Sequence, residues 1–161
     1  MTLNELLAQG RIQRHRASAN EVAHLLGLAE RGAADAGVDA ISTDLRFCAA
    51  YDAALPLATI PLACAGYRTR GAGHHATTLA ALPIAMGSEV QDAAGFLEVC
   101  RTKRNVAQYQ RVGSTSGNEV QELLCAVTAL RRQVLAWLDE HYPHFLEGSR
   151  CDPQGSADAG G

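Results

Sequence analysis

The residues of this chain best suited to chemistry are a group of cations that have no acid beside them in the sequence. They are Arg101, Lys103, Arg104 and Arg111. No Asp or Glu occurs from residue 99 to residue 118. A cationic surface that also carries amides and a phenol suits a phosphate group or a nucleic acid. The alternative is a solvated helix face that binds nothing.

Helical spacing would gather most of these cations on one face. The run from residue 90 to residue 111 contains no proline and a single glycine as a weak breaker, so we predict a helix there. On a helix of about 3.6 residues per turn, residues spaced i, i+3, i+7 and i+10 share a face, which here collects Arg101, Arg104, Gln108 and Arg111. Asn105 and Tyr109 border that face, whereas Val99 and Val106 lie largely on the other side.

The segment RTKRNVAQY, residues 101 to 109, resembles the signature of the HEPN superfamily, a group of small all-helical domains. That signature is an Arg, a polar residue that is often Asn, and a His after four to six intervening positions. Arg104 and Asn105 match its start, and Tyr109 stands where a His would complete it. The layout of residues 18 to 141 also resembles stand-alone bacterial HEPN domains.

The resemblance implies a homodimer whose two motif helices meet across a shared cleft. One function it implies is a metal-independent ribonuclease of the toxin or defence kind, held in check by an antitoxin or nucleotidyltransferase partner. Arg104 would then steady the phosphorane, and Asn105 would orient a phosphate or the catalytic side chain. Tyr109 would act as an acid or as a hydrogen-bond donor, because a phenol with a pKa of about 10 is a poor base at neutral pH.

Two further functions stay open beside the ribonuclease. The first is a non-catalytic HEPN dimer that binds RNA, a nucleotide or a partner protein, in which Tyr109 stacks or donates a hydrogen bond. The second is an interaction protein in which Arg101, Arg104 and Tyr109 build the dimer interface. The replacement of His by Tyr109 favours binding, whereas the retained Arg104–Asn105 pair favours cleavage.

Two adjacent histidines are candidates for the missing base. His74 and His75 follow a glycine-rich loop at residues 66 to 73, and in the HEPN layout this loop often lies near the motif helix. The alternative is that one of them caps the next helix. Adjacent histidines point in different directions, and no third ligand is close in the sequence, so we predict neither a metal site nor a cofactor.

Length and composition indicate that helices position these residues. A chain of 161 residues is long enough for one domain with a real core. Hydrophobic residues make up 47% of it and aromatic residues only 5%, which favours close-packed helices over a sheet sandwich. We predict an all-α fold: an antiparallel, HEPN-like bundle of four to five main helices over residues 1 to 147. Residues 148 to 161 have no apolar pattern and are predicted to be a disordered tail.

Charge and cysteine usage limit the class of protein. The formal charge of −3 and the pI of about 6.0 exclude a globally basic nucleic-acid binder, so any such function needs a local patch. The five cysteines include no C-x-x-C pair and we predict no signal peptide, a combination typical of reduced thiols in a cytoplasmic protein. The apolar run from residue 53 to residue 65 is too short to cross a bilayer, so we predict no membrane contact.

Caps and prolines predict several helix boundaries. Ser42 is the predicted N-cap of a long helix that continues, bent, through Pro56 and Pro61. Asp52 in that helix is either a surface carboxylate or an inward-facing partner of an arginine such as Arg104.

The remaining chain carries one break, one core helix and one basic cluster. A break is predicted from residue 83 to residue 88, and the apolar stripe from residue 120 to residue 138 predicts a final core helix with Asn118 as its N-cap. The basic cluster either contacts an anion or is a solvated junction, and it consists of Arg11, Arg14, His15 and Arg16.

Overall fold

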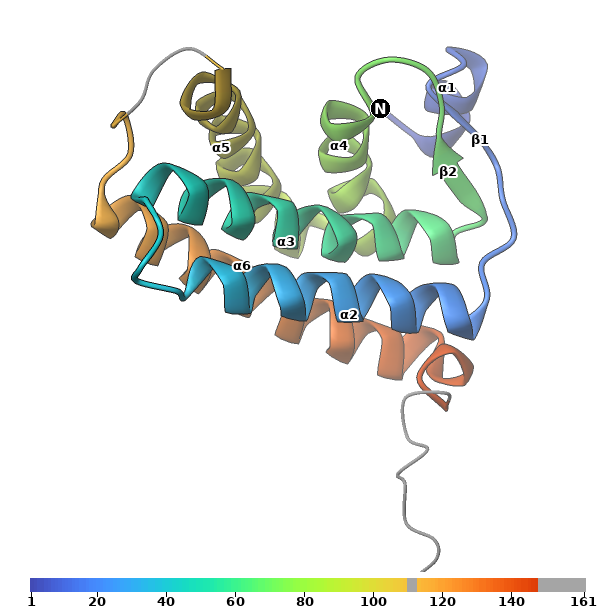
Figure 1. Cartoon of the computed structure of the whole chain (residues 1–161). Coiled ribbons are helices and arrows are strands. Elements are labelled where there is room, and N and C mark those ends of the chain that lie inside the picture. Colours follow the sequence, from blue (N-terminus) through green and yellow to red (C-terminus); the bar gives the residue numbers. More distant parts are fainter. Residues whose placement is uncertain (110–112, 148–161) are drawn as a thin grey trace, which may run out of the picture.

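The computed structural model describes residues 1–109 and 113–147. Within these residues the predicted all-α fold is confirmed, and six helices form a bundle (Figure 1). The helices are α1 (Leu3–Ala8), α2 (Ala19–Ala36), α3 (Thr43–Cys64), α4 (His74–Met86), α5 (Gln91–Tyr109) and α6 (Gly117–His141). Two 3-10 helices are added to them, η1 (Ser88–Val90) and η2 (Pro143–Phe145). The predicted tail, residues 148–161, lies outside the described residues.

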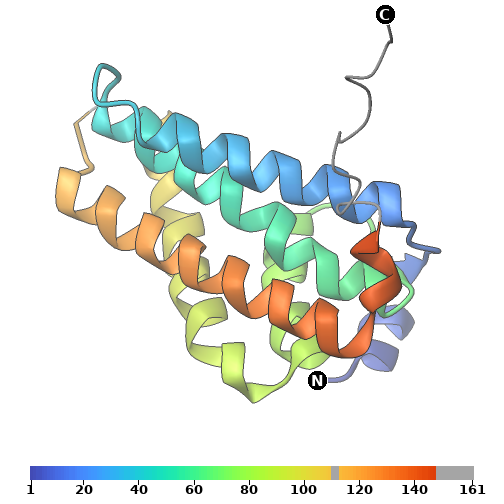
Figure 2. The ribbon, with the colours of Figure 1, turned by 90° about the horizontal axis from the view of Figure 1, so that it is seen from below.

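Helix α3 is the centre of the bundle. Helices α2, α3 and α6 lie alongside one another, and α4 and α5 stand across the opposite side of α3 (Figures 1 and 2). Helix α2 runs antiparallel to α3, and α5 runs antiparallel to α4 (Figure 1). Helix α3 contacts each of the other four long helices. The helix that carries the histidines and the helix that carries the arginine motif are therefore held against the same support.

The sequence of α3 explains why it can be so closely surrounded. Its hydroxyl N-cap is Ser42, as predicted, and the helix is continuous through Pro56 and Pro61. Small side chains let α2 approach closely: a Cβ added at Gly32 of α2 would lie only 3.0 Å from the Cβ of Ala53. A larger residue at position 32 would force these two helices apart.

Helix α3 is also long and apolar enough to cross a membrane by length and composition, with a mean hydropathy of 1.4. The apolar run considered in the sequence, residues 53 to 65, covers only the second half of this helix and its C-cap. In the described structure 61% of its most apolar window is buried inside the bundle. The core helix of a soluble protein meets the same criteria, so α3 alone is weak evidence for a membrane span.

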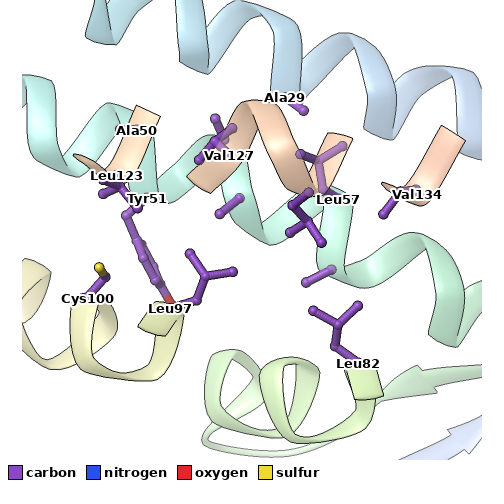
Figure 3. Close-up of a cluster of buried hydrophobic side chains, with 14 of the residues drawn as sticks. Ala29, Ala50, Tyr51, Leu57, Leu82, Leu97, Cys100, Leu123, Val127 and Val134 are labelled. Carbon is purple, nitrogen blue, oxygen red and sulfur yellow. The ribbon is translucent and has the colours of Figure 1, made fainter. Parts of the chain in front are cut away.

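The apolar stripe of the last helix forms much of the core, as predicted. Its buried members are Val120, Leu123, Val127, Leu130, Val134 and Leu138. They pack with residues such as Ala29 of α2 and Leu57 of α3 (Figure 3). The predicted N-cap was wrong: Ser116, and not Asn118, caps α6, in a reciprocal capping box with Glu119.

The predicted break at residues 83 to 88 was wrong in part. Helix α4 continues through Pro83 and ends at Met86, and Gly87 then turns the chain at a φ of 115°. The proline removes one backbone donor, but Leu79 and Leu82 of the same helix are buried and hold it in place. The chain next forms η1, so that α5 begins at Gln91.

A two-stranded ribbon is the part of the fold that was not predicted. Strand β1 (Ile12–Arg14) pairs antiparallel with β2 (Tyr67–Thr69), with Ile12 opposite Thr69 and Arg14 opposite Tyr67. The basic cluster and the glycine-rich loop of the sequence therefore meet here. A small separate core lies under the ribbon and α1, formed by Leu6, Ile12, Leu62 and Ala81.

Candidate functional site

The predicted motif helix is α5, and its packing decides which of its residues are accessible. Its buried side, with Leu97, Cys100 and Ala107, faces the core. Val99, in contrast, has 68% of its surface exposed, and Asn105 is also exposed. The helix therefore presents a surface to solvent as well as a packed side.

Each described cation of α5 is paired with a carboxylate. The pairs are Arg101 with Glu98 (Nη2 to Oε1, 2.7 Å), Arg104 with Asp52 (Nη2 to Oδ1, 3.1 Å) and Lys103 with Glu119. The sequence-based expectation of a cationic face without a compensating acid was therefore wrong for Arg101 and Arg104, and Lys103 of the same acid-free segment is paired as well. The acid-free window ends at residue 118, and two of the three carboxylates come from other helices, α3 and α6.

The contact between Arg104 and Asp52 combines both alternatives considered for Asp52. Its carboxylate is exposed, with 49% of the side chain accessible, and it accepts hydrogen bonds from Arg104 at 3.1 and 3.3 Å. The Arg104 side chain itself is only 16% exposed. The Asp52 contacts use one nitrogen of the guanidinium, Nη2, and the buried Nε has no hydrogen-bond partner within the described chain.

Tyr51, the residue before Asp52, lies beneath this pair. The Arg104 Cζ atom is 5.9 Å from the centroid of the Tyr51 ring, within the range of a cation–π contact. Tyr51 is fully buried, and its ring points from α3 toward α5 beside Leu97 and Cys100 (Figure 3). Its hydroxyl has no hydrogen-bond partner in the described part of the chain, which is uncommon for a buried polar group. Burial raises the pKa of the phenol, so it stays protonated and can only donate or accept a hydrogen bond.

His75, at the start of α4, reaches the same place from a different helix. The centroid of its ring lies 6.0 Å from that of Tyr51. Burial lowers the pKa of His75 below its ordinary value of 6.5, the positive charge of Arg104 lowers it further, and Asp52 acts in the opposite direction. The imidazole is therefore neutral at neutral pH, which is the form able to accept a proton. No side-chain hydrogen bond caps α4, so the predicted capping alternative is wrong.

We call this group the Arg104 cluster, and it draws on three helices. It consists of Tyr51 and Asp52 from α3, His75 from α4, and Glu98, Arg101 and Arg104 from α5. Arg101 belongs to it because its charge acts on both Tyr51 and His75, while its guanidinium is bonded to Glu98. The guanidinium of Arg104, the neutral imidazole of His75 and the buried hydroxyl of Tyr51 thus lie together.

The other predicted site residues are less closely tied to this cluster. Asn105 is exposed on α5, and His74 is exposed at the first position of α4. Gln108 and Tyr109 belong to the last turn of α5, but the structure does not describe their side chains. Arg111 lies outside the described residues.

Two grooves border the Arg104 cluster. One of about 450 Å³ lies between α3 and α5, and its walls include Asp44, Cys48, Asp52 and Arg104. Another of about 510 Å³ lies between α4 and α5, with Glu98 in its wall. Of the two, the groove between α3 and α5 is the one that Arg104 itself lines.

The described residues contain no group of three or more His, Cys, Asp or Glu side chains that could hold a metal ion. No family model, curated protein or solved structure was found to match the chain. The function must therefore be argued from the geometry of the cluster.

Sequence reasoning missed two members of the cluster, Glu98, which pairs with Arg101, and Tyr51. Tyr51 is the only aromatic residue in the apolar run from residue 49 to residue 65, and it directly precedes the one acid of that run. This adjacency was the available signal. It was weak, because a Tyr in an apolar helix is usually a core residue.

Proposed function

We propose that the chain is a metal-independent ribonuclease that acts at the Arg104 cluster. The observation that carries the proposal is the position of His75, whose ring centroid lies 6.0 Å from that of Tyr51, the ring against which the Arg104 guanidinium also lies at 5.9 Å. In the HEPN-like motif the expected His is replaced by Tyr109, and His75 supplies the missing base from another helix. The proposal keeps Arg104, Asn105 and Tyr109 in the reaction and adds Tyr51, whose ring lies beneath Arg104.

The proposed reaction is transesterification within the RNA. The neutral imidazole of His75 takes the proton of a ribose 2′-hydroxyl, and the 2′-oxygen attacks the adjacent phosphorus. The Arg104 guanidinium stabilises the negative charge of the phosphorane. The bond to the 5′-oxygen then breaks, and Tyr109 donates a proton to that oxygen. The products are a 2′,3′-cyclic phosphate and a 5′-hydroxyl. Water then carries the proton that His75 gained to Tyr109, which restores both side chains.

The resting pair between Arg104 and Asp52 fits this role. Asp52 bonds to Nη2 alone, so a phosphate can use other donors of the guanidinium without breaking the ion pair. The carboxylate also limits the mobility of the side chain before substrate arrives. A cation that is already oriented loses less entropy when the phosphate binds.

The second candidate is a non-catalytic dimer that binds RNA, a nucleotide or a partner protein. The observation that favours it is the pairing of Arg101, Lys103 and Arg104, each of which has a carboxylate partner. The exposed Val99 on α5 would add an apolar contact between two copies. An antitoxin or nucleotidyltransferase partner and a cytoplasmic location are compatible with both candidates.

The test is cleavage of an end-labelled RNA pool by metal-stripped protein in chelator. Wild type is compared with Arg104→Ala, His75→Ala and Tyr109→Phe, and Arg131→Ala, on an exposed part of α6, is the matched control. The ribonuclease proposal expects cleavage by wild type and by the control, and loss of cleavage with Arg104→Ala and His75→Ala. Sizing with light scattering shows whether each variant keeps its oligomeric state.

The alternatives give different results in the same assay. RNA that is bound through Arg104 but never cut would make the protein a binding module. Neither cutting nor binding, together with a dimer that Arg104→Ala dissociates, would make the α5 face a dimer interface.

A further inference from the structure

A second group of cations lies at the other end of the described molecule, on the β ribbon. It consists of Arg11, Arg14, Arg16, Arg68 and Arg70, which belong to β1 and β2 or flank them. We call it the arginine ribbon. Residues 6 to 20 and residues 53 to 88 contain no Asp or Glu, and the antiparallel pairing lays these two acid-free segments side by side. A chain with a formal charge of −3 thus gathers five of its 14 Lys and Arg residues here.

The arginines of the ribbon differ from those of α5 in their partners. Within the described residues none of the five forms an ion pair with a carboxylate. The nearby acid Glu21 is engaged by the imidazole of His15 at 2.8 Å. Arg11 donates through Nε to the Thr77 hydroxyl at 3.3 Å. The exposed members are Arg14, Arg16, Arg68 and Arg70.

We infer that the arginine ribbon binds the backbone of single-stranded RNA, and its part in the reaction rests on the proposed function. Arginine is the cation best suited to phosphate, because its planar fork donates two parallel hydrogen bonds to phosphate oxygens. Four exposed arginines without carboxylate partners can each exchange water and counterions for a phosphate. Tyr67 lies half-buried beside Arg14, whose Cζ is 5.8 Å from the ring centroid, and this pair offers a stacking surface for a base.

The ribbon leads directly to the Arg104 cluster. Strand β2 runs through the loop at residues 70 to 73 into α4, whose second residue is His75. The hydrogen bond from Arg11 to Thr77 ties the ribbon to the first turn of that helix. Helix α4 stands between the ribbon and α5 (Figure 1). An RNA strand on the ribbon therefore continues over the start of α4 to Arg104, and the ribbon holds the nucleotides that flank the cleaved bond.

The surface around the ribbon suits RNA better than an anionic lipid bilayer. A peripheral membrane surface usually adds apolar side chains that insert between the lipids. The large hydrophobic residues exposed in the described structure are Met1, Leu28, Val38, Ile41, Leu45 and Val99. Of these, Met1 alone belongs to the N-terminal segment that precedes the ribbon. Vesicle binding is therefore an outcome for the test to separate.

The test measures binding without cleavage. The probe is a fluorescent 2′-O-methyl oligouridylate, whose blocked 2′-oxygen cannot attack phosphorus. Wild type is compared with the pair Arg68→Gln and Arg70→Gln, and with the matched control pair Arg131→Gln and Arg132→Gln on exposed positions of α6. We expect the ribbon pair to weaken binding about tenfold and to reduce the slope of log K against log salt by about 1.4. The control pair should change neither quantity.

Equal affinities for the ribbon pair and the control pair would overturn the inference. So would stronger, ribbon-dependent binding to phosphatidylserine vesicles than to the oligonucleotide. Circular dichroism confirms that each variant is folded. Because the readout is independent of cleavage, failure of the proposed function would be seen as absent cleavage with ribbon-dependent binding intact. Failure of this inference would be seen if wild type cleaves RNA and the Arg68→Gln and Arg70→Gln pair still binds the oligonucleotide as tightly as wild type.

Discussion

The two cationic regions of this protein have similar compositions and opposite surroundings. On α5 the described cations Arg101, Lys103 and Arg104 all have carboxylate partners. On the arginine ribbon none of the five has one within the described residues. Both regions come from acid-free stretches of sequence, yet only one remains acid-free when the chain folds. Pairing, and not composition, therefore distinguishes them.

The proposed function assigns a different role to each of the two cationic regions. A paired and largely buried cation such as Arg104 is held in one orientation, which suits a group that must meet a developing charge. Exposed arginines without a carboxylate partner keep their counterions, which suits affinity for a polyanion without a fixed register. We therefore expect variants of the two regions to change different quantities.

The largest effect should follow from Arg104→Ala. Loss of one positioned charge donor from the transition state is expected to lower the rate of RNA cleavage about 100-fold or more. Arg104→Lys should recover little of that rate, because an ammonium cannot bind Asp52 and a phosphate in the same planar geometry. Single-turnover cleavage of labelled RNA measures the effect. If Arg104→Ala weakened RNA binding and left the single-turnover rate unchanged, the contrast with the ribbon would disappear.

The next effect sharpens the comparison through substrate length. The pair Arg68→Gln and Arg70→Gln should lower kcat/KM about tenfold for long RNA and leave it unchanged for a dinucleotide, which is too short to reach the ribbon. Comparison of the two substrates at low and high salt provides the measurement. An equal loss for the dinucleotide would indicate damage to the Arg104 cluster in place of a lost contact with flanking nucleotides.

A smaller effect concerns pH and the base. The pKa of His75 lies below its ordinary value of 6.5, so the neutral base form already dominates at about pH 6.5. We therefore expect kcat/KM to rise with pH and to reach its plateau by that pH. Asp52 raises the pKa of His75, so Asp52→Asn should move the rise in kcat/KM to still lower pH. The pH profiles of the two proteins test this shift. A profile that is the same with Asp52→Asn would mean that Asp52 does not act on the titrating base, and a profile that is also the same with His75→Gln would remove His75 from the reaction.

The same lowered pKa makes a prediction about stability. A His that is neutral in the folded protein binds its proton more readily when the chain unfolds, so its contribution to stability is lost as pH falls below about 6.5. His75→Gln should reduce the loss of stability between neutral and mildly acidic pH. Urea unfolding at both pH values measures it, and His74→Gln, at an exposed position, is the control.

The smallest effect is expected from Tyr51→Phe. Removal of a buried hydroxyl that has no partner in the described chain should leave the free energy of unfolding unchanged or raise it by about 1 kcal/mol. A fall in cleavage without a fall in stability would show that this buried hydroxyl acts on the reaction through Arg104 or His75, which lie beside the Tyr51 ring. A loss of more than about 2 kcal/mol would mean that the hydroxyl is bonded in the native protein.

The sequence predicted the helical elements well where a single segment carried the whole signal. The stripe on α6 and the Ser42 cap of α3 are local patterns, and both were found in the structure. The ribbon was missed because each strand has three residues, too few for an alternating pattern, and its partner is more than 50 residues away. The Asn118 cap failed by two positions, since Ser116 offered an equally good hydroxyl and a capping box.

The Arg104 cluster was predictable only in part. Arg101 and Arg104 were candidates from their helical spacing, Asp52 was named as a partner of an arginine, and His75 was named from its place after a glycine-rich loop. Tyr51 was not found, because nothing local distinguishes it from a core aromatic residue. Its significance comes from a missing hydrogen bond, which is a property of its surroundings.

By itself, then, the sequence determined the all-α class, the core stripe and the presence of arginines in acid-free segments of the chain. These features depend on helix periodicity and composition, which act over a few turns. Only the tertiary structure decided which arginines meet a carboxylate. Asp52 and Glu119 reach α5 from other helices, and the two acid-free segments of the ribbon meet through strand pairing. Charge interactions depend on distance in space, so the partner of a charged residue is set by the packing of helices that are remote in the chain.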